Sequence, residues 1–321
     1  MSVPATQQAL ALLTLHGVWS IITMDVDKPG PGELLVRVEA TALNPVDWKV
    51  QSESAYYNSF VSEYPAIMGT DAAGVVAAVG EGVSNFAVGD KVLHQGSFTN
   101  RLATFKQYTI SLAHITTKIP ENITFDQAAS LPVGVATAAI GLYAKQSASG
   151  GADLVAPWKE GGRGKYAGQP IFITGGSSSV GQYVIQFAKL SGFSPIITTI
   201  SPRHNDLVQS LGVTHPIDRS LSPDDIIAAV KKITTEPLKV VYDAIASATT
   251  QSLSYDLLSP GGTLVLSLKS SIPEDKLTGD KVVIPTFGSV HQEVNKEFGK
   301  ELYNNFTEYL RTGVIKVRRT L

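Results

Sequence analysis

The sequence contains no cysteine among its 321 residues. Disulfides, thiolate zinc ligands and a cysteine nucleophile are therefore excluded, because each requires a thiol. The chain also has little excess charge, since 26 basic and 28 acidic residues leave a formal net charge of -2. Without a broad electropositive field, neither nucleic acid nor an anionic membrane surface is expected as the main partner.

Long apolar runs are absent as well. No segment approaches the roughly 20 consecutive apolar residues that span a bilayer, and residues 1–15 lack the basic start of a signal peptide. We therefore expect a cytoplasmic protein with no membrane segment. Hydrophobic residues make up 43% of the chain and charged residues 17%, which is typical of a folded globular protein of one large or two smaller domains.

The pattern of apolar residues changes near residue 125. Before it, short β-type runs alternate with turns rich in glycine and proline, at residues 33–40, 74–79, 91–93 and 107–110. This pattern is typical of a compact β-rich barrel. After it, apolar strands alternate with amphipathic helices, which predicts a parallel sheet covered by helices. The expected strands are residues 171–174, 195–200, 239–243 and 263–267, and residues 147–169 are expected to form an exposed loop.

The segment Gly175-Gly176-Ser177-Ser178-Ser179-Val180-Gly181 follows one of these strands and precedes a helix-like stretch. A strand, a glycine-rich turn and a helix in this order expose backbone N–H groups to a phosphate. Gly175 and Gly181 hold the outer glycine positions of a dinucleotide-binding fingerprint, and Ser178 replaces the middle glycine. We predict that Gly175, Ser177, Ser178, Ser179 and Val180 contact a pyrophosphate. The alternative is an ordinary turn without a ligand, and Ser178 is either a further hydroxyl donor or a weakened variant.

The end of the next expected strand indicates which cofactor is bound. NAD enzymes place an acidic residue there, whereas this chain has Ser201-Pro202-Arg203-His204-Asn205, and its first acid is Asp206. A hydroxyl and a guanidinium suit a 2′-phosphate. We therefore predict NADPH, bound by Ser201, Arg203 and His204, with Arg219 as a second cation. The alternative for each arginine is a solvated surface side chain.

Four further segments carry a resemblance to a known family. They are Leu43-Asn44-Pro45-Val46-Asp47-Trp48-Lys49, Met68-Gly69-Thr70-Asp71-Ala72-Ala73-Gly74-Val75-Val76, Val88-Gly89-Asp90-Lys91-Val92 and Ala129-Ser130-Leu131-Pro132. Together with the phosphate turn, their order and spacing resemble the medium-chain dehydrogenase/reductase superfamily. Over residues 10–290 the chain is most similar to the zinc-independent quinone reductase and enoyl reductase branch, and in particular to fungal trans-acting enoyl reductases.

The resemblance implies an α/β chain with a GroES-like β-rich barrel domain and a Rossmann domain built on a doubly wound parallel sheet. The substrate domain is expected at residues 1–125 and the NADP-binding domain at residues 126–270. Residues 271–321 are expected to return to the first domain in shortened form, because members of the family normally continue past Arg318-Arg319-Thr320-Leu321. A monomer or a homodimer is expected.

The resemblance also implies the chemistry. Zinc-dependent members bind their metal with a cysteine and a His-Glu pair, where this chain has Asn44 and Thr70-Asp71, so no metal is expected. Without zinc, a C=C bond conjugated to a carbonyl is the better hydride acceptor. Asn44 and Lys49 are the predicted catalytic residues. Lys49 is expected to bind the cofactor or to stabilise the developing enolate, and the alternative is that it is an exposed lysine without a catalytic role. Tyr56 is predicted as a proton donor, and Tyr57, water or plain aromatic packing are its alternatives.

The remaining predicted contacts all belong to the cofactor site that the resemblance implies. They are Asn44, Pro45, Asp47, Trp48, Thr137, Asp243, Ala244 and Ile245, and Asp47 also suits a cap hydrogen bond. The expected activity is NADPH-dependent reduction of an enone or enoyl thioester. Quinone reduction, cofactor binding with little catalysis, and a partnership with a carrier protein of a polyketide synthase are the alternatives.

Overall fold

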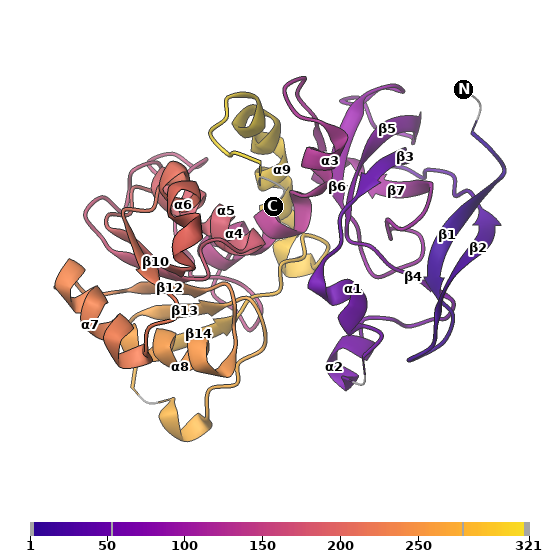
Figure 1. Ribbon diagram of the computed structural model, residues 1–321. Coiled ribbons are helices and arrows are strands. Elements are labelled where there is room, and N and C mark those ends of the chain that lie inside the picture. Colours follow the sequence, from indigo (N-terminus) through magenta and orange to yellow (C-terminus); the bar gives the residue numbers. More distant parts are fainter. Residues whose placement is uncertain (1–2, 53, 278, 318–321) are drawn as a thin grey trace. The chain divides into compact units, whose positions relative to one another are not determined.

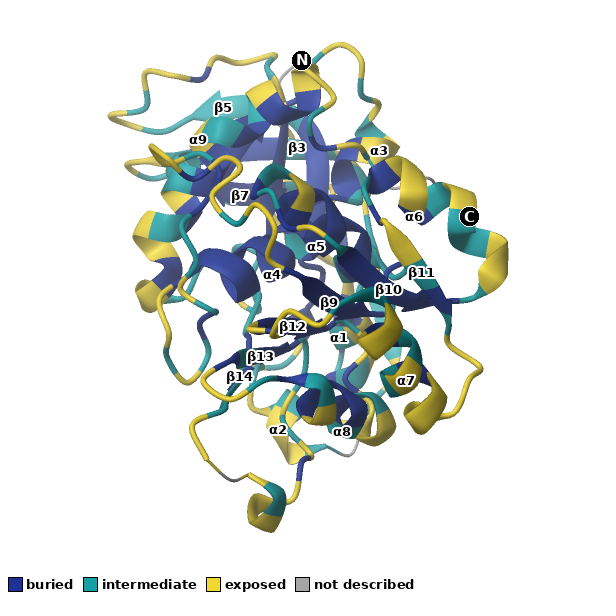
Figure 2. Ribbon diagram, turned by 90° about the vertical axis from the view of Figure 1, so that its left-hand side faces the viewer, coloured by how far each residue is buried: buried dark blue, intermediate teal, exposed yellow. Residues whose placement is uncertain are grey.

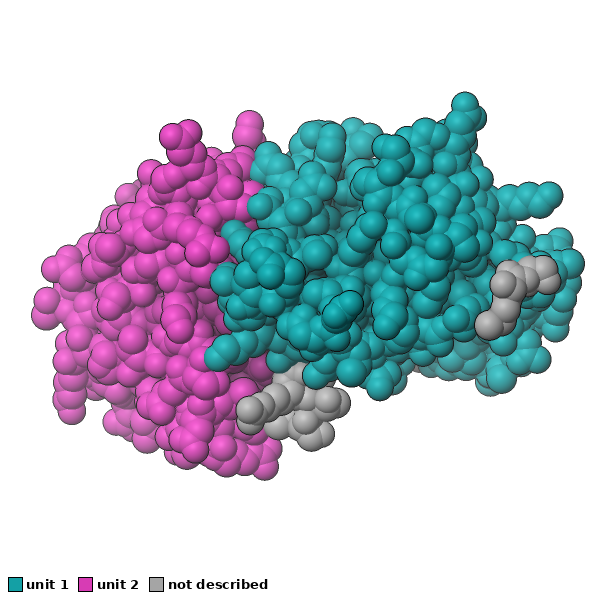
Figure 3. Space-filling view, turned by 90° about the horizontal axis from the view of Figure 1, so that it is seen from above, with its two compact units in different colours: residues 1–133, 289–321 teal, residues 134–288 magenta. Residues whose placement is uncertain are grey.

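The computed structural model describes residues 3–52, 54–277 and 279–317, so Arg318-Arg319-Thr320-Leu321 lie outside the described residues. The chain divides into two compact units (Figure 3): residues 1–133 with 289–321, and residues 134–288. The boundaries lie further along the chain than the expected residues 125 and 270. Residues 271–288 belong to the second unit because they add a strand to its sheet, and residues from 289 onward join the first unit.

The first unit is built mainly from β-strands, in a five-stranded sheet of order β7-β3-β5-β6-β8 and a three-stranded sheet of order β2-β1-β4 (Figure 1). The strands are β1 Thr6–Leu12, β2 Trp19–Asp25, β3 Glu33–Thr41, β4 Ala66–Ile67, β5 Asp71–Val79, β6 Lys91–Gln95, β7 Tyr108–Leu112 and β8 Thr116–Lys118. Alternating side chains of a strand share one face, so Leu34 and Val36 pack with Val76 and Val92 in one buried cluster. The expected β-rich barrel is confirmed.

Short helices and one long helix complete this unit. They are α1 Pro45–Lys49, α2 Ala55–Asn58, α3 Phe125–Ala129, α9 Lys296–Arg311 and the 3-10 turns η1 Ala113–Ile115 and η4 Glu293–Asn295. In α9, the buried side chains of Leu302, Phe306 and Leu310 recur every four residues and form its apolar face. The Thr117 hydroxyl donates a hydrogen bond to the Tyr303 carbonyl oxygen at 2.9 Å. These contacts explain why a segment distant in sequence belongs to the first unit.

The second unit contains a six-stranded parallel sheet of order β11-β10-β9-β12-β13-β14. Its strands are β9 Ile171–Thr174, β10 Ile196–Ile200, β11 His215–Asp218, β12 Val240–Asp243, β13 Thr263–Leu266 and β14 Val282–Pro285. Helices α4 Pro132–Tyr143, α5 Ser179–Leu190, α6 Asn205–Leu211, α7 Pro223–Ile233 and α8 Ala248–Leu257 connect or flank them, with η2 Pro202–His204 and η3 Glu274–Lys276. The first strand, β9, lies between β10 and β12, which is the doubly wound order that was expected.

Burial explains why the inner strands are mostly apolar (Figure 2). All residues of β9, β10 and β12 are buried, because helices cover both faces of such a sheet. Residues 147–169 contain no helix or strand, as expected, but they are not simply an exposed loop. Tyr166 stacks on Phe193 with ring centres 4.9 Å apart, and Trp158 packs against Tyr143 at 5.5 Å. In the described part of the chain, no helix is both long and apolar enough to cross a membrane.

Candidate functional site

The turn between β9 and α5 has the backbone geometry of a phosphate-binding loop. Gly175 has φ of 70°, a left-handed conformation that favours glycine. A Cβ at Gly181 would overlap the carbonyl oxygen of Gly175, so only glycine lets the first turn of α5 approach the strand this closely. These are the close-turn and close-packing functions that the fingerprint requires of its outer glycines.

Ser178 is the N-cap of α5, and its hydroxyl oxygen accepts the Gly181 N–H at 3.1 Å. The Ser178 N–H itself donates to the Gly175 carbonyl oxygen at 2.8 Å. Among the described residues, the backbone N–H groups of Ser177, Ser179 and Val180 have no hydrogen-bond partner. Three unpaired donors at the N-terminus of a twelve-residue helix form a favourable site for an anion.

Asp243 organises the neighbouring turn at the end of β12. Its carboxylate is fully buried, and one oxygen, Oδ1, accepts the N–H groups of Ile245 at 3.0 Å and Ala246 at 2.8 Å, together with the Thr174 hydroxyl. The turn holds Ile245 against Gly175, and the Ile245 side chain fills the space that a Cβ on residue 175 would need. The Asp243 side chain thus supports the turn through hydrogen bonds, and Ala244 and Ile245 form part of the turn itself.

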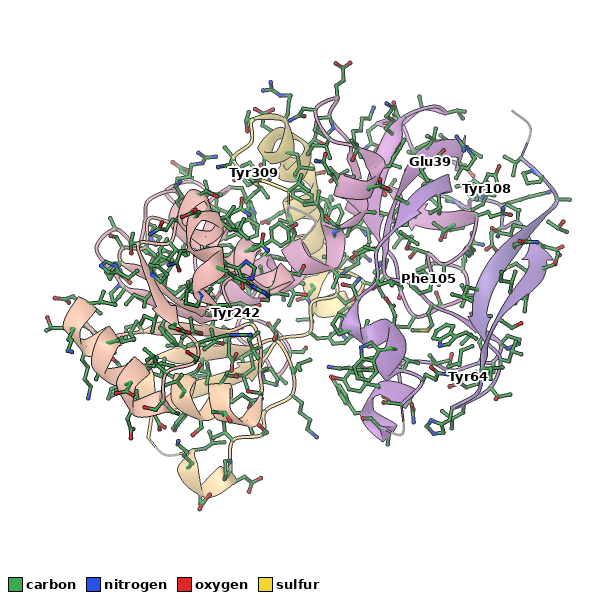
Figure 4. The ribbon with its side chains drawn as sticks, in the orientation of Figure 1. Glu39, Tyr64, Phe105, Tyr108, Tyr242 and Tyr309 are labelled. Carbon is green, nitrogen blue, oxygen red and sulfur yellow. The ribbon has the colours of Figure 1, made fainter. Side chains whose placement is uncertain are left out.

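Thr137 lies in α4 with 7% of its surface exposed. Its carbonyl oxygen accepts the hydroxyl of Tyr242, labelled in Figure 4, at 2.9 Å. Burial raises the pKa of Tyr242 above its usual range, and the Asp243 charge adds to this. The Tyr242 hydroxyl is therefore a protonated donor that ties α4 to the end of β12.

The carboxyl ends of β10 and β11 lie side by side, and two of the predicted 2′-phosphate ligands, Ser201 and Arg219, follow them directly. Ile200 pairs with Asp218 in the parallel register, and the Arg219 N–H donates to the Ile200 carbonyl oxygen at 2.9 Å. Ser201 therefore lies beside Arg219. Arg203 is exposed in η2, and its Nε donates to Nε2 of His204 at 3.1 Å.

Two acids, Asp206 and Asp218, belong to the same part of the second unit. Asp206 is exposed in the first turn of α6. The Asp218 carboxylate accepts the Ser220 N–H at 2.9 Å, and this hydrogen bond, with Arg219 nearby, lowers the pKa of Asp218. The Asp218 carboxylate thus stabilises the turn that follows β11.

In the first unit, Asn44 lies in a polar cluster with Thr70 and Asp71. Its side-chain Nδ2 donates to Asp71 Oδ2 at 2.7 Å and to Thr70 Oγ1 at 3.2 Å. The other Asp71 oxygen, Oδ1, accepts the Val133 N–H at 2.7 Å. Within the described ranges, no group of three histidine, cysteine, aspartate or glutamate side chains is arranged to hold a metal ion.

Asp47 holds the start of α1, which begins at Pro45. Its Oδ2 accepts the Asn44 N–H at 2.7 Å, and its own N–H donates to the Asn44 carbonyl oxygen at 3.0 Å. Burial raises the pKa of Asp47 to about 6. The sequence-based alternative of a cap hydrogen bond thus describes what the Asp47 side chain does in the structure.

Lys49 lies at the end of α1 against aromatic side chains. Its Nζ donates to the Tyr57 hydroxyl oxygen at 3.3 Å, and the ring centres of Tyr57 and Trp48 are 5.1 Å and 5.9 Å from Nζ. Trp48 is 62% exposed and Tyr56 is 45% exposed. The structure therefore brings the Tyr57 hydroxyl to the ammonium group of Lys49, and the predicted proton donor, Tyr56, lies half exposed beside Tyr57.

Sequence reasoning missed three residues that shape these sites: Thr174, Thr199 and Tyr57 as the partner of Lys49. Thr199 accepts the Gly175 N–H with its carbonyl oxygen at 3.1 Å, and Thr174 donates to Asp243. Their positions at the carboxyl ends of β9 and β10 were the available signal, since ligands of such sheets bind there. No local signal distinguishes Tyr57 from Tyr56.

Two models of known protein families match parts of this chain. Residues 30–121 match the model of the alcohol dehydrogenase GroES-like domain, and residues 179–289 match that of the zinc-binding dehydrogenase. A trans-enoyl reductase of Aspergillus sclerotiorum is 33% identical over 322 residues, which are 92% of this chain and 87% of the relative. A trans-enoyl reductase of Gibberella fujikuroi is 30% identical over 311 residues, covering 92% and 85%.

Solved structures share the fold over nearly the whole chain. An alcohol dehydrogenase superfamily protein from Novosphingobium aromaticivorans has a TM-score of 0.78 and 26% identity, covering 96% of this chain and 88% of that one. A mycobacterial protein complexed with NADPH has a TM-score of 0.73 at 22% identity, covering 97% and 90%. A quinone oxidoreductase from Coxiella burnetii has a TM-score of 0.68 at 22% identity, covering 94% and 88%. The chain therefore belongs to the medium-chain dehydrogenase/reductase superfamily, in the group that contains the fungal trans-enoyl reductases.

Proposed function

We propose that this protein is a zinc-independent, NADPH-dependent reductase that transfers hydride to the C=C bond of an α,β-unsaturated carbonyl compound. The observation that carries the proposal is the set of three unpaired N–H groups, of Ser177, Ser179 and Val180, at the start of α5. Such donors suit a pyrophosphate. The names of the Aspergillus and Gibberella relatives, trans-enoyl reductases, support enoyl reduction.

The second unit would hold the adenosine end of the cofactor. The close approach of Gly181 to Gly175 leaves the turn open to a pyrophosphate, with Ser178 as cap and hydroxyl donor. Ser201, Arg203, His204 and Arg219 would bind the 2′-phosphate, because a phosphate attracts a guanidinium fork. Thr137, Ala244 and Ile245 are proposed as contacts nearer the nicotinamide. Asp243 would hold the turn that carries Ala244 and Ile245 through its hydrogen bonds.

When bound, NADPH supplies the hydride. In the first unit, the Asn44 amide is held by Asp71 and Thr70, so its orientation is set before any ligand arrives. The Lys49 ammonium would stabilise the carbonyl oxygen as negative charge develops on it. Tyr56 or water would donate the proton to the α-carbon, and Pro45, Asp47 and Trp48 are proposed to border the cofactor with Asn44.

Quinone reduction is the second candidate, favoured by the fold shared with the quinone oxidoreductase of Coxiella burnetii. A third candidate is an acceptor presented as a thioester on a carrier protein of a polyketide synthase, which the trans-enoyl reductase names favour. All three activities would use the same NADPH-binding residues, so only the hydride acceptor distinguishes them.

Loss of NADPH absorbance with an enone, a simple enoyl thioester, a carrier-bound enoyl thioester and a quinone tests the proposal. We expect turnover with the enone or the thioesters, and a preference for NADPH over NADH that falls at least tenfold in Arg203→Ala, because one charge-assisted hydrogen bond contributes about 1.5–3 kcal/mol. Turnover restricted to the carrier-bound thioester would select the third candidate. Turnover with quinone alone would favour the second, and saturable NADPH binding without turnover would refute catalysis.

A further inference from the structure

Lys49 is a cation held by aromatic groups instead of an acid. Its ammonium donates to the Tyr57 hydroxyl oxygen at 3.3 Å and lies over the rings of Tyr57 and Trp48. Among the residues that the structure describes, no carboxylate lies within ion-pair distance of it. Aromatic faces and a neutral hydroxyl stabilise an ammonium without neutralising its charge. In the described part of the chain, no acid therefore competes with an anionic oxygen for the Lys49 ammonium.

Tyr57 is itself fixed by packing. Its ring meets Phe60 edge to face with centres 5.9 Å apart, and Phe60 packs against Phe98 at 5.0 Å. Tyr56 packs edge to face on both Tyr57 and Phe60, with centres 5.1 Å apart in each case. Helix α2 has only four residues and cannot hold its position by its own hydrogen bonds. These rings therefore determine where the Tyr57 hydroxyl lies, and through it the position of the Lys49 ammonium.

The Tyr56 hydroxyl, in contrast, makes no hydrogen bond among the described residues, and the side chain is 45% exposed. Nothing in α2 fixes that hydroxyl in relation to Lys49. The Tyr57 hydroxyl accepts a hydrogen bond from Lys49 and keeps its own proton as a donor. The two adjacent tyrosines therefore differ in what they can do for the reaction.

We propose that Tyr57 is the positioning residue of Lys49, holding its ammonium for the carbonyl oxygen that becomes an enolate when hydride adds to the distal carbon. This inference rests on the proposed function for the identity of that oxygen. The contact between Tyr57 and Lys49 is a property of the protein alone.

A double-mutant cycle tests the inference by turnover of an enone with NADPH, using Tyr57→Phe, Lys49→Ala and the double variant. We expect Tyr57→Phe to lower kcat about tenfold, since it removes one hydrogen bond to a charged group, without changing the Kd of NADPH. In the Lys49→Ala background the same change is expected to have no further effect, because Tyr57 acts through Lys49. An equal loss in both backgrounds, or no loss in the parent protein, would overturn the inference.

Tyr108→Phe, in β7, is the matched control, and turnover is expected to remain at the parental level. Tyr56→Phe distinguishes the two neighbours, because the inference predicts a non-additive cycle with Lys49 for Tyr57 only. A non-additive cycle for Tyr56 and an additive one for Tyr57 would assign the positioning role to Tyr56 and refute the inference.

A second measurement does not depend on turnover. Limited acylation of the cofactor-free protein with acetic anhydride, followed by peptide mass spectrometry, reports how freely each lysine reacts. Tyr57→Leu removes the ring and the hydroxyl, so we expect Lys49 to react severalfold faster, while Lys91, which lies over Phe125 at 5.7 Å, is unchanged. An unchanged rate at Lys49 would overturn the inference. If the parent protein shows no enone turnover while this rate rises, the contact stands and only the proposed function fails.

Discussion

Two buried carboxylates hold the backbone of the candidate sites. Asp47 accepts the Asn44 N–H at the start of α1, and Asp243 accepts two N–H groups in the turn after β12. A buried carboxylate is costly unless donors surround it. Through these hydrogen bonds, both residues fix a loop conformation.

Asp47 predicts a specific dependence of stability on pH. Burial raises its pKa from 3.8 to about 6, so between these values the folded protein keeps a proton that the unfolded chain releases. The free energy of unfolding therefore falls as pH rises through this window, by about 3 kcal/mol at 1.36 kcal/mol per pKa unit. Below pH 3.8 this destabilising contribution is absent, and above pH 6 it is complete.

Urea unfolding of the parent protein and of Asp47→Asn at several pH values measures this contribution. Asparagine does not titrate, so the free energy of unfolding of the parent protein minus that of Asp47→Asn is expected to fall by about 2.4 kcal/mol from pH 4 to pH 7. The other titrating groups cancel in the difference. A difference that stays constant with pH would show that Asp47 titrates alike in the folded and unfolded chains.

At the scale of elements, the N-terminus of α5 combines two functions in one turn. Ser178 satisfies the Gly181 N–H as the helix cap, while the N–H groups of Ser177, Ser179 and Val180 stay unpaired among the described residues. A glycine in place of Ser178 would have no side-chain oxygen to accept the Gly181 N–H. The serine that departs from the glycine pattern therefore has a local structural reason.

Replacement of the cap tests whether Ser178 also contacts the cofactor. Ser178→Ala is expected to lower the free energy of unfolding by about 1 kcal/mol, as is typical for loss of a serine cap, and to raise the Kd of NADPH. Ser222→Ala is the matched control, because the Ser222 hydroxyl oxygen caps α7 by accepting the Asp225 N–H at 3.2 Å. Chemical denaturation and NADPH titration measure both effects.

We expect Ser222→Ala to lose similar stability with no change in NADPH affinity. If both variants bind NADPH as tightly as the parent protein, Ser178 is a cap only and the predicted hydroxyl contact is wrong. If Ser178→Ala loses affinity but not stability, the capping role is wrong instead.

At the scale of the whole molecule, the two units differ in how the chain builds them. Residues 134–288 are continuous and contain the complete parallel sheet, whereas the first unit needs two separate segments. We expect a fragment of residues 134–288 to unfold cooperatively by circular dichroism. Residues 1–133 alone are expected not to, because they lose α9 and with it the buried side chains of Leu302, Phe306 and Leu310.

A matched fragment that joins residue 133 to residue 289 through a flexible linker is expected to restore cooperative unfolding of the first unit. Cooperative unfolding of residues 1–133 by themselves would contradict this prediction, since α9 would then add nothing essential to the fold.

Much of this organisation was predictable from local patterns. The strands at residues 171–174 and 263–267, the glycine turn and the order of the expected strands each depend on residues close together in the sequence. Strand β14 was not predicted, because Val282–Pro285 is short and pairs with β13 only after the chain returns to the sheet edge. The pairing of Lys49 with Tyr57 was also not decided, since two adjacent tyrosines carry the same local signal.

The sequence by itself determined which groups this protein has available: no thiol, a glycine- and serine-rich turn between a strand and a helix, and Ser201, Arg203 and His204 ahead of the first acid, Asp206. These properties depend on which residues are present and on short spacings. Only the tertiary structure decided which hydrogen bonds these groups make. Ser178 caps α5, Asp47 and Asp243 accept N–H groups of their own loops, and the Tyr57 hydroxyl accepts a hydrogen bond from Lys49. Packing and burial decide which of several similar side chains makes a given contact. These forces act between residues that are far apart in the sequence, so short-range patterns do not reveal them.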